Sequence, residues 1–164
     1  VEAMTRVDND CVLIVMGPDG GCSERLKEIA ARSGLTGTKV HFHEAVPQAQ
    51  LLEWVASADV GIVPYPAVDL NARLCTPNKL FDFITCGVPV LANDLPELRR
   101  IIGDSGIGIV ADMSDVASLA RAITQILSSD LAEMRKQSLK LSPKMCWQEQ
   151  EPVLLALYSV MPNR

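Results

Sequence analysis

The feature of this sequence that most constrains its fold is an alternation of short apolar segments with stretches of helical periodicity. Such alternation is typical of βαβ units, in which parallel strands are joined by right-handed helical crossovers. The sequence therefore predicts an α/β fold, a Rossmann-like open parallel sheet with helices on both faces and further helices at the C-terminus. The expected strands are residues 12–16, 39–43, 59–64, 88–92 and 106–110.

The intervening helices are predicted from apolar residues at helical spacing and from residues that start or stop helices. Ser23 is expected to cap the first of these helices. Before it, the continuous apolar run at 12–16 predicts a strand that is buried in a parallel sheet. No internal repeat or low-complexity linker divides the chain, so one domain is expected over residues 1–164. The expected helices are residues 23–33, 48–56, 76–86, 96–102 and 114–127, then 131–139 and 147–160.

Charge and hydropathy exclude several classes of protein. The net charge is −5, and no cluster of Lys and Arg interleaves with aromatic residues, so nucleic acid is not an expected partner. The apolar runs are far shorter than the roughly 20 residues that span a bilayer. The first residues contain no basic region followed by an apolar stretch, so no signal peptide is expected either.

The cysteines and histidines do not suggest a metal site. The five cysteines are odd in number and widely spaced, and none lies in a Cys-x-x-Cys pair. Reduced thiols in a cytoplasmic protein are the expected state. His41 and His43 are expected to point to opposite faces of their strand, where they could not chelate one metal ion. The prediction is therefore that no metal is bound.

Ligands of open parallel sheets bind beyond the carboxyl ends of the strands, which directs attention to four loops. The sharpest signal is the loop 64–76 and the helix after it, where Thr76 is expected to cap the backbone amides and Pro77 to occupy the first helical position. The free amides and the positive helix end suit a phosphate or diphosphate, and Lys79 or Arg73 could add charge. An ordinary helix start would show the same pattern.

Several familiar nucleotide and hydrolase motifs are missing. Residues 17–22 follow a strand but lack the Gly-x-Gly-x-x-Gly spacing of a dinucleotide-binding turn, so a tight turn at the ligand edge is the favoured interpretation. The sequence contains no Gly-x-x-x-x-Gly-Lys-Ser/Thr and no Gly-x-Ser-x-Gly. P-loop NTPases and α/β-hydrolases are excluded on this ground.

Two segments, Asp59-Val-Gly-Ile-Val-Pro-Tyr-Pro66 and Pro77-Asn-Lys-Leu-Phe-Asp-Phe-Ile-Thr-Cys-Gly-Val-Pro-Val90, carry a family resemblance. In order and spacing they resemble retaining glycosyltransferases of the GT-B fold, glycosyl transferases group 1, which use nucleotide-sugar donors. Weaker matches lie at 13–17, 40–47 and 147–158. The resemblance implies a C-terminal donor-binding domain that faces an acceptor-binding domain across a cleft. It implies no cofactor, because the nucleotide diphosphate sugar is the donor substrate.

The resemblance also implies roles for individual residues. In such enzymes two glutamates eight residues apart flank the donor loop, and the corresponding residues here are Leu74 and Asp82. Asp82 could accept hydrogen bonds from ribose hydroxyls, whereas Leu74 cannot bond the sugar, so Arg73, Thr76 or backbone amides would have to replace it. The loop 43–47 corresponds to the base-binding edge. The expected donor-binding residues are Gly17, His43, Glu44, Arg73, Thr76, Asn78, Lys79, Leu80 and Asp82, and no catalytic residue is assigned.

The same resemblance implies that residues 1–164 are part of a larger enzyme. The donor domain of the family usually begins with a further strand and helix, and neither these nor the acceptor domain is found here. Transfer by this chain alone is therefore not expected. The acceptor, whether glycan, lipid or small molecule, is open, and any peripheral membrane contact would involve the missing domain.

Two other classes of function remain as alternatives. A flavodoxin-like receiver module fits the alternation of strands and helices, but the third strand ends in Pro64-Tyr-Pro66 without the Asp that receivers phosphorylate. A nucleotide-sugar epimerase or a non-catalytic relative of the GT-B fold is the other alternative. In the latter, Leu74 would mark lost activity.

Overall fold

The computed structural model describes residues 1–8, 10–18 and 21–159, and its parallel strands form two separate sheets. One sheet pairs β1 (Leu13–Met16) with β2 (Val40–His43). The other has the order β3 (Gly61–Val63), β4 (Val90–Asn93) and β5 (Gly108–Ala111). All five strands lie where the sequence predicts them and all pairs are parallel, so the α/β prediction is confirmed. The sheet itself is divided between β1 and β3.

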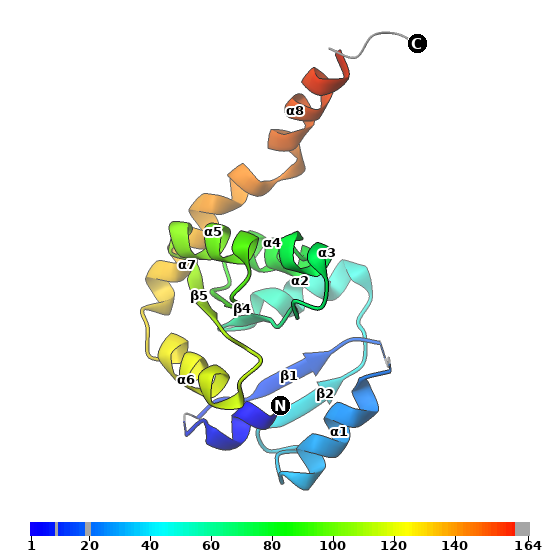
Figure 1. Ribbon diagram of the computed structural model, residues 1–164, viewed down its shortest axis with the longest axis vertical. Coiled ribbons are helices and arrows are strands. Elements are labelled where there is room, and N and C mark those ends of the chain that lie inside the picture. Colours follow the sequence, from blue (N-terminus) through cyan, green and yellow to red (C-terminus); the bar gives the residue numbers. More distant parts are fainter. Residues whose placement is uncertain (9, 19–20, 160–164) are drawn as a thin grey trace.

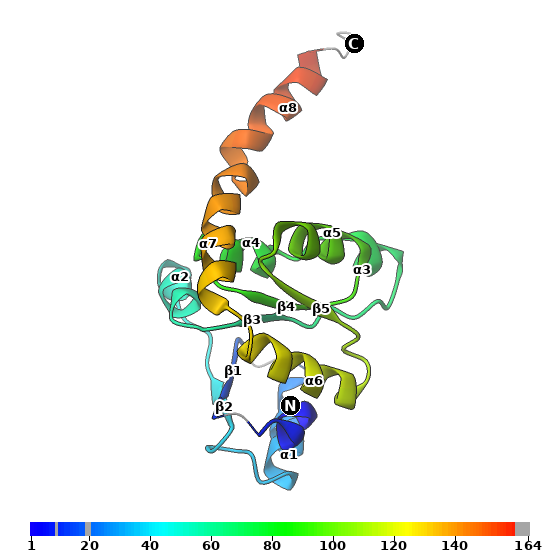
Figure 2. The ribbon, with the colours of Figure 1, turned by 90° about the vertical axis from the view of Figure 1, so that its left-hand side faces the viewer.

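Helices cover both faces of the three-stranded sheet, as predicted. In Figure 2, α4 and α5 lie on one side of β3–β5 and α6 lies on the other. The C-terminal helix α8 extends away from the body of the domain (Figure 1). The predicted helices are found as α1 (Ser23–Arg32), α2 (Gln48–Ala56), α4 (Asn78–Thr85), α5 (Pro96–Ser105), α6 (Val116–Leu127), α7 (Leu131–Leu141) and α8 (Trp147–Ser159). Position 160, where the last helix was expected to end, lies outside the described residues.

Three short helices were not predicted: η1 (Glu2–Arg6), α3 (Leu70–Leu74) and η2 (Ser142–Met145). They have one or two turns each, too short for apolar periodicity to reveal them.

Two predicted caps are wrong. Ser23 is the first residue of α1, after Cys22 at the capping position, and α4 is preceded by Pro77 rather than Thr76; neither helix start has a side-chain cap.

Two hydrophobic clusters hold the elements together. The first contains Val40 of β2 and Leu91 of β4, with η1, α1 and α6 packed around them, so it runs beneath both sheets. Leu13 and Val15 of β1 pack against the same cluster. The second cluster lies on the opposite face of β3–β5 and includes Leu80 of α4 together with residues of α5. The chain is therefore one packed unit although its sheet is divided.

The family-like segment 77–90 has clear packing reasons for several of its residues. Leu80 and Ile84 of α4 are fully buried in the second cluster. Gly87 ends the helix with φ +69°, and a Cβ there would lie 2.8 Å from the side chain of Leu139. Since L-residues rarely adopt this backbone conformation, glycine is required at the turn into β4. Much of the motif thus encodes the fold rather than ligand contacts.

The strand β1 is less buried than its sequence predicts. Its apolar run predicts burial in a parallel sheet, but none of its four residues is fully buried, and the side chain of Ile14 is 53% exposed. The prediction of a buried strand is wrong because β1 pairs with a neighbour on one side only. β2, in contrast, alternates as expected, with Val40 and Phe42 on the covered face.

Candidate functional site

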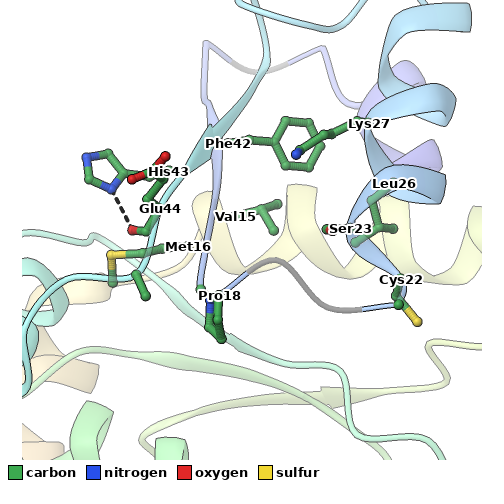
Figure 3. Close-up of a pocket in the computed structure, with 13 residues that line it drawn as sticks. Val15, Met16, Pro18, Cys22, Ser23, Leu26, Lys27, Phe42, His43 and Glu44 are labelled. Atoms are coloured by element: carbon green, nitrogen blue, oxygen red, sulfur yellow. Dashed lines mark hydrogen bonds between the residues drawn. The ribbon is translucent and has the colours of Figure 1, made fainter.

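A hollow of about 760 Å³ opens at the carboxyl ends of β1 and β2, beside the first turns of α1. Figure 3 shows Val15 and Phe42 of the sheet and Leu26 of α1 around this space. Three predicted donor-binding residues, Gly17, His43 and Glu44, line it. Their positions follow from the fold, because each directly follows or ends one of the two strands. Of the loop 17–21, residues 19 and 20 lie outside the described chain.

His43 is held in a defined orientation at the rim of the hollow. Its ring lies against Trp54 of α2, with ring centroids 4.4 Å apart. The Nδ1 atom lies 2.8 Å from the backbone oxygen of Glu44. Because a carbonyl oxygen only accepts, Nδ1 carries the hydrogen of this bond, and Nε2 is the ring atom left for a ligand.

The prediction that His41 and His43 point to opposite faces is wrong. Residues two apart in a strand share a face, and both histidines are exposed on the face of β2 that the core does not cover. The Nε2 of His41 lies 3.3 Å from the Thr38 backbone oxygen. Within residues 1–8, 10–18 and 21–159, no three His, Cys, Asp or Glu side chains are grouped so that they could hold a metal ion.

A second group of predicted residues lies on α3 and the loop after it. Asp69 caps α3, since its side chain accepts a hydrogen bond of 2.6 Å from the Ala72 N–H. Arg73 and Leu74 lie on the last turn, and Leu74 is 54% exposed. The segment Asp69-Leu-Asn-Ala-Arg is an N-cap pattern from which this helix could have been predicted.

The N-terminus of α4 presents open backbone donors. Asn78 and Lys79 are exposed in its first turn, and the described part of the chain offers no hydrogen-bond partner for their backbone N–H groups. Thr76 is half-buried before the helix and does not cap it. The next N–H, that of Leu80, donates to the Pro77 oxygen at 3.0 Å, and the Leu80 side chain is fully buried. Leu80 therefore positions the turn, and its side chain does not reach a ligand.

Asp82 is a half-buried carboxylate one turn further along α4. Burial raises the pKa of Asp82 above its ordinary value. No hydrogen bond or ion pair to its carboxylate is found among the residues that the structure describes. Four residues on, the Cys86 thiol lies 3.5 Å from the Leu52 oxygen of α2, and burial and the nearby Asp82 raise its pKa. Hydroxyl donors of a ligand would satisfy this carboxylate.

One residue of this edge was assigned no role from the sequence, although it opens one of the four predicted ligand-edge loops, residues 93–97. Asn93, at the end of β4, donates from Nδ2 to the Tyr65 oxygen at 2.8 Å. Its Oδ1 accepts from the backbone N–H groups of Asp94 at 3.0 Å and Met113 at 3.2 Å. Asn93 thus ties together the loops that follow β3, β4 and β5. An amide at a strand end, with both a donor and an acceptor, is the only sequence signal for this role.

The two ends of the loop between β3 and α4 lie close together. The nearby Cys75 side chain raises the pKa of Tyr65, mainly through the negative charge of its thiolate. Tyr65 opens the loop and Cys75 lies just before α4, so this contact joins its two ends. Asn93 holds the start of the loop that carries Arg73 and Leu74, and Cys75, near the end of this loop, lies close to that start.

The two groups of predicted site residues do not meet. Gly17, His43 and Glu44 belong to the two-stranded sheet, whereas the segment from Arg73 to Asp82 follows the three-stranded sheet. Across the described ranges, no hydrogen bond or ion pair joins one group to the other. Both groups lie beyond strand carboxyl ends, as predicted, with the division of the sheet between them.

A comparison with families of known proteins matches residues 1–129 to the model described as "Glycosyl transferases group 1". Among curated proteins, D-inositol 3-phosphate glycosyltransferase of Xylanimonas cellulosilytica is 24% identical, over all of this chain and 39% of its own length. The enzyme of the same name from Acidothermus cellulolyticus is 28% identical, over 90% of this chain and 32% of its own. The chain therefore spans 32–39% of the length of these two relatives.

Solved structures have the same fold. Sucrose-phosphate synthase from Thermosynechococcus elongatus superposes with a TM-score of 0.75 and 22% identity, over 96% of this chain and 40% of that one. Anabaena Alr3699/HepE in complex with UDP and glucose superposes with a TM-score of 0.74 and 16% identity, over 97% of this chain and 43% of that one.

No helix in the described ranges has both the length and the apolar character to cross a membrane. The family match covers residues 1–129, which include all five strands and both groups of candidate residues. By sequence and by fold, the chain belongs to the glycosyl transferases group 1 family.

Proposed function

We propose that this chain is the donor-binding part of a glycosyltransferase that transfers a sugar from a nucleotide diphosphate sugar to an acceptor. The observation that carries the proposal is the N-terminus of α4, where open amides at Asn78 and Lys79 are followed by the unpaired carboxylate of Asp82. An anion and a hydroxyl-bearing sugar are the complementary ligand groups. A nucleoside diphosphate contains both.

Each part of the donor has a matching position. The diphosphate lies at the α4 amides, where Lys79 and Arg73 add positive charge and have no ion-pair partner within the described residues. Ribose hydroxyls donate to Asp82, and the base lies toward His43 and Glu44 at the rim of the hollow. Thr76 offers a hydroxyl beside the phosphates, and Gly17 leaves open space, since a Cβ there would meet no atom within 4 Å.

The organisation of the whole protein is part of this proposal. Transfer requires donor and acceptor to be held in near-attack geometry, which one side of a cleft does not provide. We expect an acceptor-binding domain elsewhere in the protein, which would also decide whether the acceptor is a glycan, a lipid or a small molecule and whether a membrane surface is contacted. No cofactor is required, and the five free thiols favour a cytoplasmic location.

Donor binding is tested by calorimetry on the full-length protein with UDP-, GDP- and ADP-sugars. One of them is expected to bind, with UDP-glucose the first choice because a related fold was solved with UDP and glucose. An Asp82→Ala variant should bind about tenfold more weakly, the loss of roughly 1.4 kcal/mol. Asp59→Ala, at an exposed carboxylate before β3, is the matched control and should bind normally. If no sugar nucleotide binds, the proposal fails.

A GT-B relative without transferase activity is the second candidate, and Leu74 is the observation that favours it. The resemblance places a sugar-binding glutamate at this position, but the leucine is 54% exposed and offers no hydrogen bond. Since the side chain is exposed, Leu74→Glu should fold normally. If the full-length protein transfers sugar only as this variant, the non-catalytic assignment holds for the natural chain. Turnover by the natural protein excludes it.

A further inference from the structure

We infer that the groove between η1 and α6 is a second binding site, which takes a phosphorylated sugar or polyol. A hollow of about 450 Å³ opens there, within the size range of small-molecule sites, about 300–1,000 Å³. In both views η1, next to the N-terminus, lies beside α6 (Figures 1 and 2). α6 covers the face of β3–β5 opposite to α4, and the hollow shares no lining residue with the one beside His43. It is therefore separate from the proposed donor site.

The hollow has room for a ligand because small side chains form part of its lining. Ala117 and Ala120, three residues apart on α6, both line it. Ala120 is buried in the first hydrophobic cluster, in which Met4 and Val7 of η1 are also buried. The core thus holds η1 and α6 together beneath the hollow, so its shape does not depend on a bound ligand.

Two arginines give the hollow a positive charge. Arg6 contributes to the lining from η1, and Arg121 contributes from α6. Both side chains are exposed, and neither has an ion-pair or hydrogen-bond partner among residues 1–8, 10–18 and 21–159. Arg99 and Arg100 of α5, in contrast, are each paired with a carboxylate. No aspartate or glutamate in the described part of the chain lines the hollow, so the two charges are available to an anion.

The guanidinium donors suit a phosphoryl group better than a carboxylate. A guanidinium presents parallel N–H groups that bind two oxygens of an anion at once. A carboxylate has only two oxygens, which one arginine satisfies, whereas the three terminal oxygens of a phosphate monoester can accept from both arginines. A phosphate monoester also carries a charge of about −1.5 to −2 at pH 7, which balances two guanidinium groups.

The neutral part of the lining suits the hydroxyl groups of a sugar or polyol. It consists of Thr124, Gln125 and Ser128 of α6. The Ser128 hydroxyl donates to the Thr124 backbone oxygen at 2.8 Å, so its Oγ remains free to accept. The Gln125 side-chain amide offers both a donor and an acceptor. No aromatic ring of the described residues lines the hollow, so a nucleobase would have nothing to stack on.

Calorimetry on the full-length protein, with glucose 6-phosphate as the probe, tests the inference. Arg6→Gln and Arg121→Gln should each weaken binding at least about tenfold, because each removes charged hydrogen bonds to the phosphate. Arg32→Gln is the matched control, since it removes the same charge from an exposed position on α1 that lines neither hollow. It should change the affinity less than about twofold. All three side chains are exposed, so the variants should fold normally.

Three further probes identify the source of the phosphate. Glucose, which lacks the phosphoryl group, should show no binding that depends on Arg121. Inorganic phosphate should bind more weakly than glucose 6-phosphate, because it lacks the hydroxyls that contact Gln125. Equal binding of the two would overturn the sugar as ligand in favour of free phosphate. Vesicles that contain phosphatidic acid should not retain the protein, and retention that depends on Arg121 would overturn it in favour of a lipid headgroup.

The same titrations separate this site from the donor site. Lys79→Gln, in the first turn of α4, should leave the binding of glucose 6-phosphate intact. Binding that is lost in this variant and kept in Arg6→Gln and Arg121→Gln would place the phosphate at α4 and overturn the inference. Absence of any binding would overturn it too. Titrations with sugar nucleotides test the donor proposal independently, because the variants at η1 and α6 leave the groups at α4 unchanged.

Discussion

The two sheets of this domain differ in how completely they are enclosed. In the three-stranded sheet, Val90, Leu91 and Ala92 of β4 are all fully buried between helices on both faces. In the two-stranded sheet no residue of β1 is fully buried, although its sequence is just as apolar. The difference teaches that an apolar run specifies which neighbours a strand requires, while the neighbours present decide how buried the strand is.

The candidate chemistry is divided in the same way. The hollow beside His43 and Glu44 belongs to the two-stranded sheet. The open amides, the cations and the Asp82 carboxylate belong to the three-stranded sheet, where Asn93 fixes the loops. In the proposed donor site, the first side would hold the base and the second the phosphates and ribose. The following tests ask whether the three-stranded sheet alone determines stability in this chain.

The largest effect is expected at Gly108, where β5 packs directly on β4. A Cβ at this position would lie 1.9 Å from the Val90 oxygen, a backbone atom that cannot move without breaking the ladder. Gly108→Ala should therefore lower the free energy of unfolding by more than about 4 kcal/mol. Urea denaturation followed by circular dichroism measures the change.

Gly103→Ala is the matched control, because a Cβ at this helical glycine would meet no atom within 4 Å. Alanine should stabilise α5 by roughly 0.5–1 kcal/mol. Similar losses for both variants would mean that β4 and β5 are not as closely packed as the structure has them.

A second pair of variants compares the two sheets directly. Leu91→Ala removes a fully buried side chain from the cluster beneath both sheets and should cost about 3 kcal/mol. Ile14→Thr keeps a β-branched residue on the exposed face of β1 and should change the free energy of unfolding by less than about 0.5 kcal/mol. Both are measured by urea denaturation of the 164-residue chain. A cost at Ile14 above about 1.5 kcal/mol would contradict the exposure of β1.

The elements that sequence predicted and those that it missed differ in their physical origin. Strands such as β4 and helices such as α6 follow from local periodicity, and all of them lie within a few residues of the prediction. The division of the sheet into β1–β2 and β3–β5 does not follow from local pattern, because strand pairing depends on which segments meet in the folded chain. Sequence also missed α3, whose five residues are too few for periodicity.

The candidate site shows the same limit. The carboxyl-edge loops were predicted from topology, and Asp82 came from the family resemblance. Asn93 lies in a predicted loop but was assigned no role, since that role depends on three loops that meet only in the folded chain. Thr76 was assigned a cap that the structure does not contain, because Pro77 directly precedes the helix.

A moderate effect is expected at Asn93. Asn93→Leu would leave the Tyr65 oxygen and the N–H groups of Asp94 and Met113 without their partner, at a cost of about 1–3 kcal/mol. Donor affinity of the full-length protein should fall as well, because the loop that carries Arg73 loses the hydrogen bond that holds its start. Thermal denaturation and calorimetry measure the two effects. Asn71→Ala, at an exposed residue of α3, is the control and should leave both nearly unchanged.

The smallest effect is expected at Asp82, and its sign distinguishes a binding residue from a structural one. Because burial raises its pKa, the ionised carboxylate destabilises the folded state, and this penalty develops as the pH rises from about 4 through the raised pKa. Asp82→Asn should therefore be slightly more stable than the natural chain at pH 7, by less than about 2 °C in Tm, since the group is partly exposed. The difference should shrink as the pH falls and vanish below about pH 3, where the carboxyl is largely protonated in both states. Donor affinity should nevertheless fall, because a neutral amide oxygen is a weaker acceptor for ribose hydroxyls than a carboxylate. Thermal scans from about pH 3 to pH 7 test the difference in stability, and calorimetry at pH 7 tests the donor affinity. A variant that loses stability at pH 7 would show that Asp82 is a structural residue of α4.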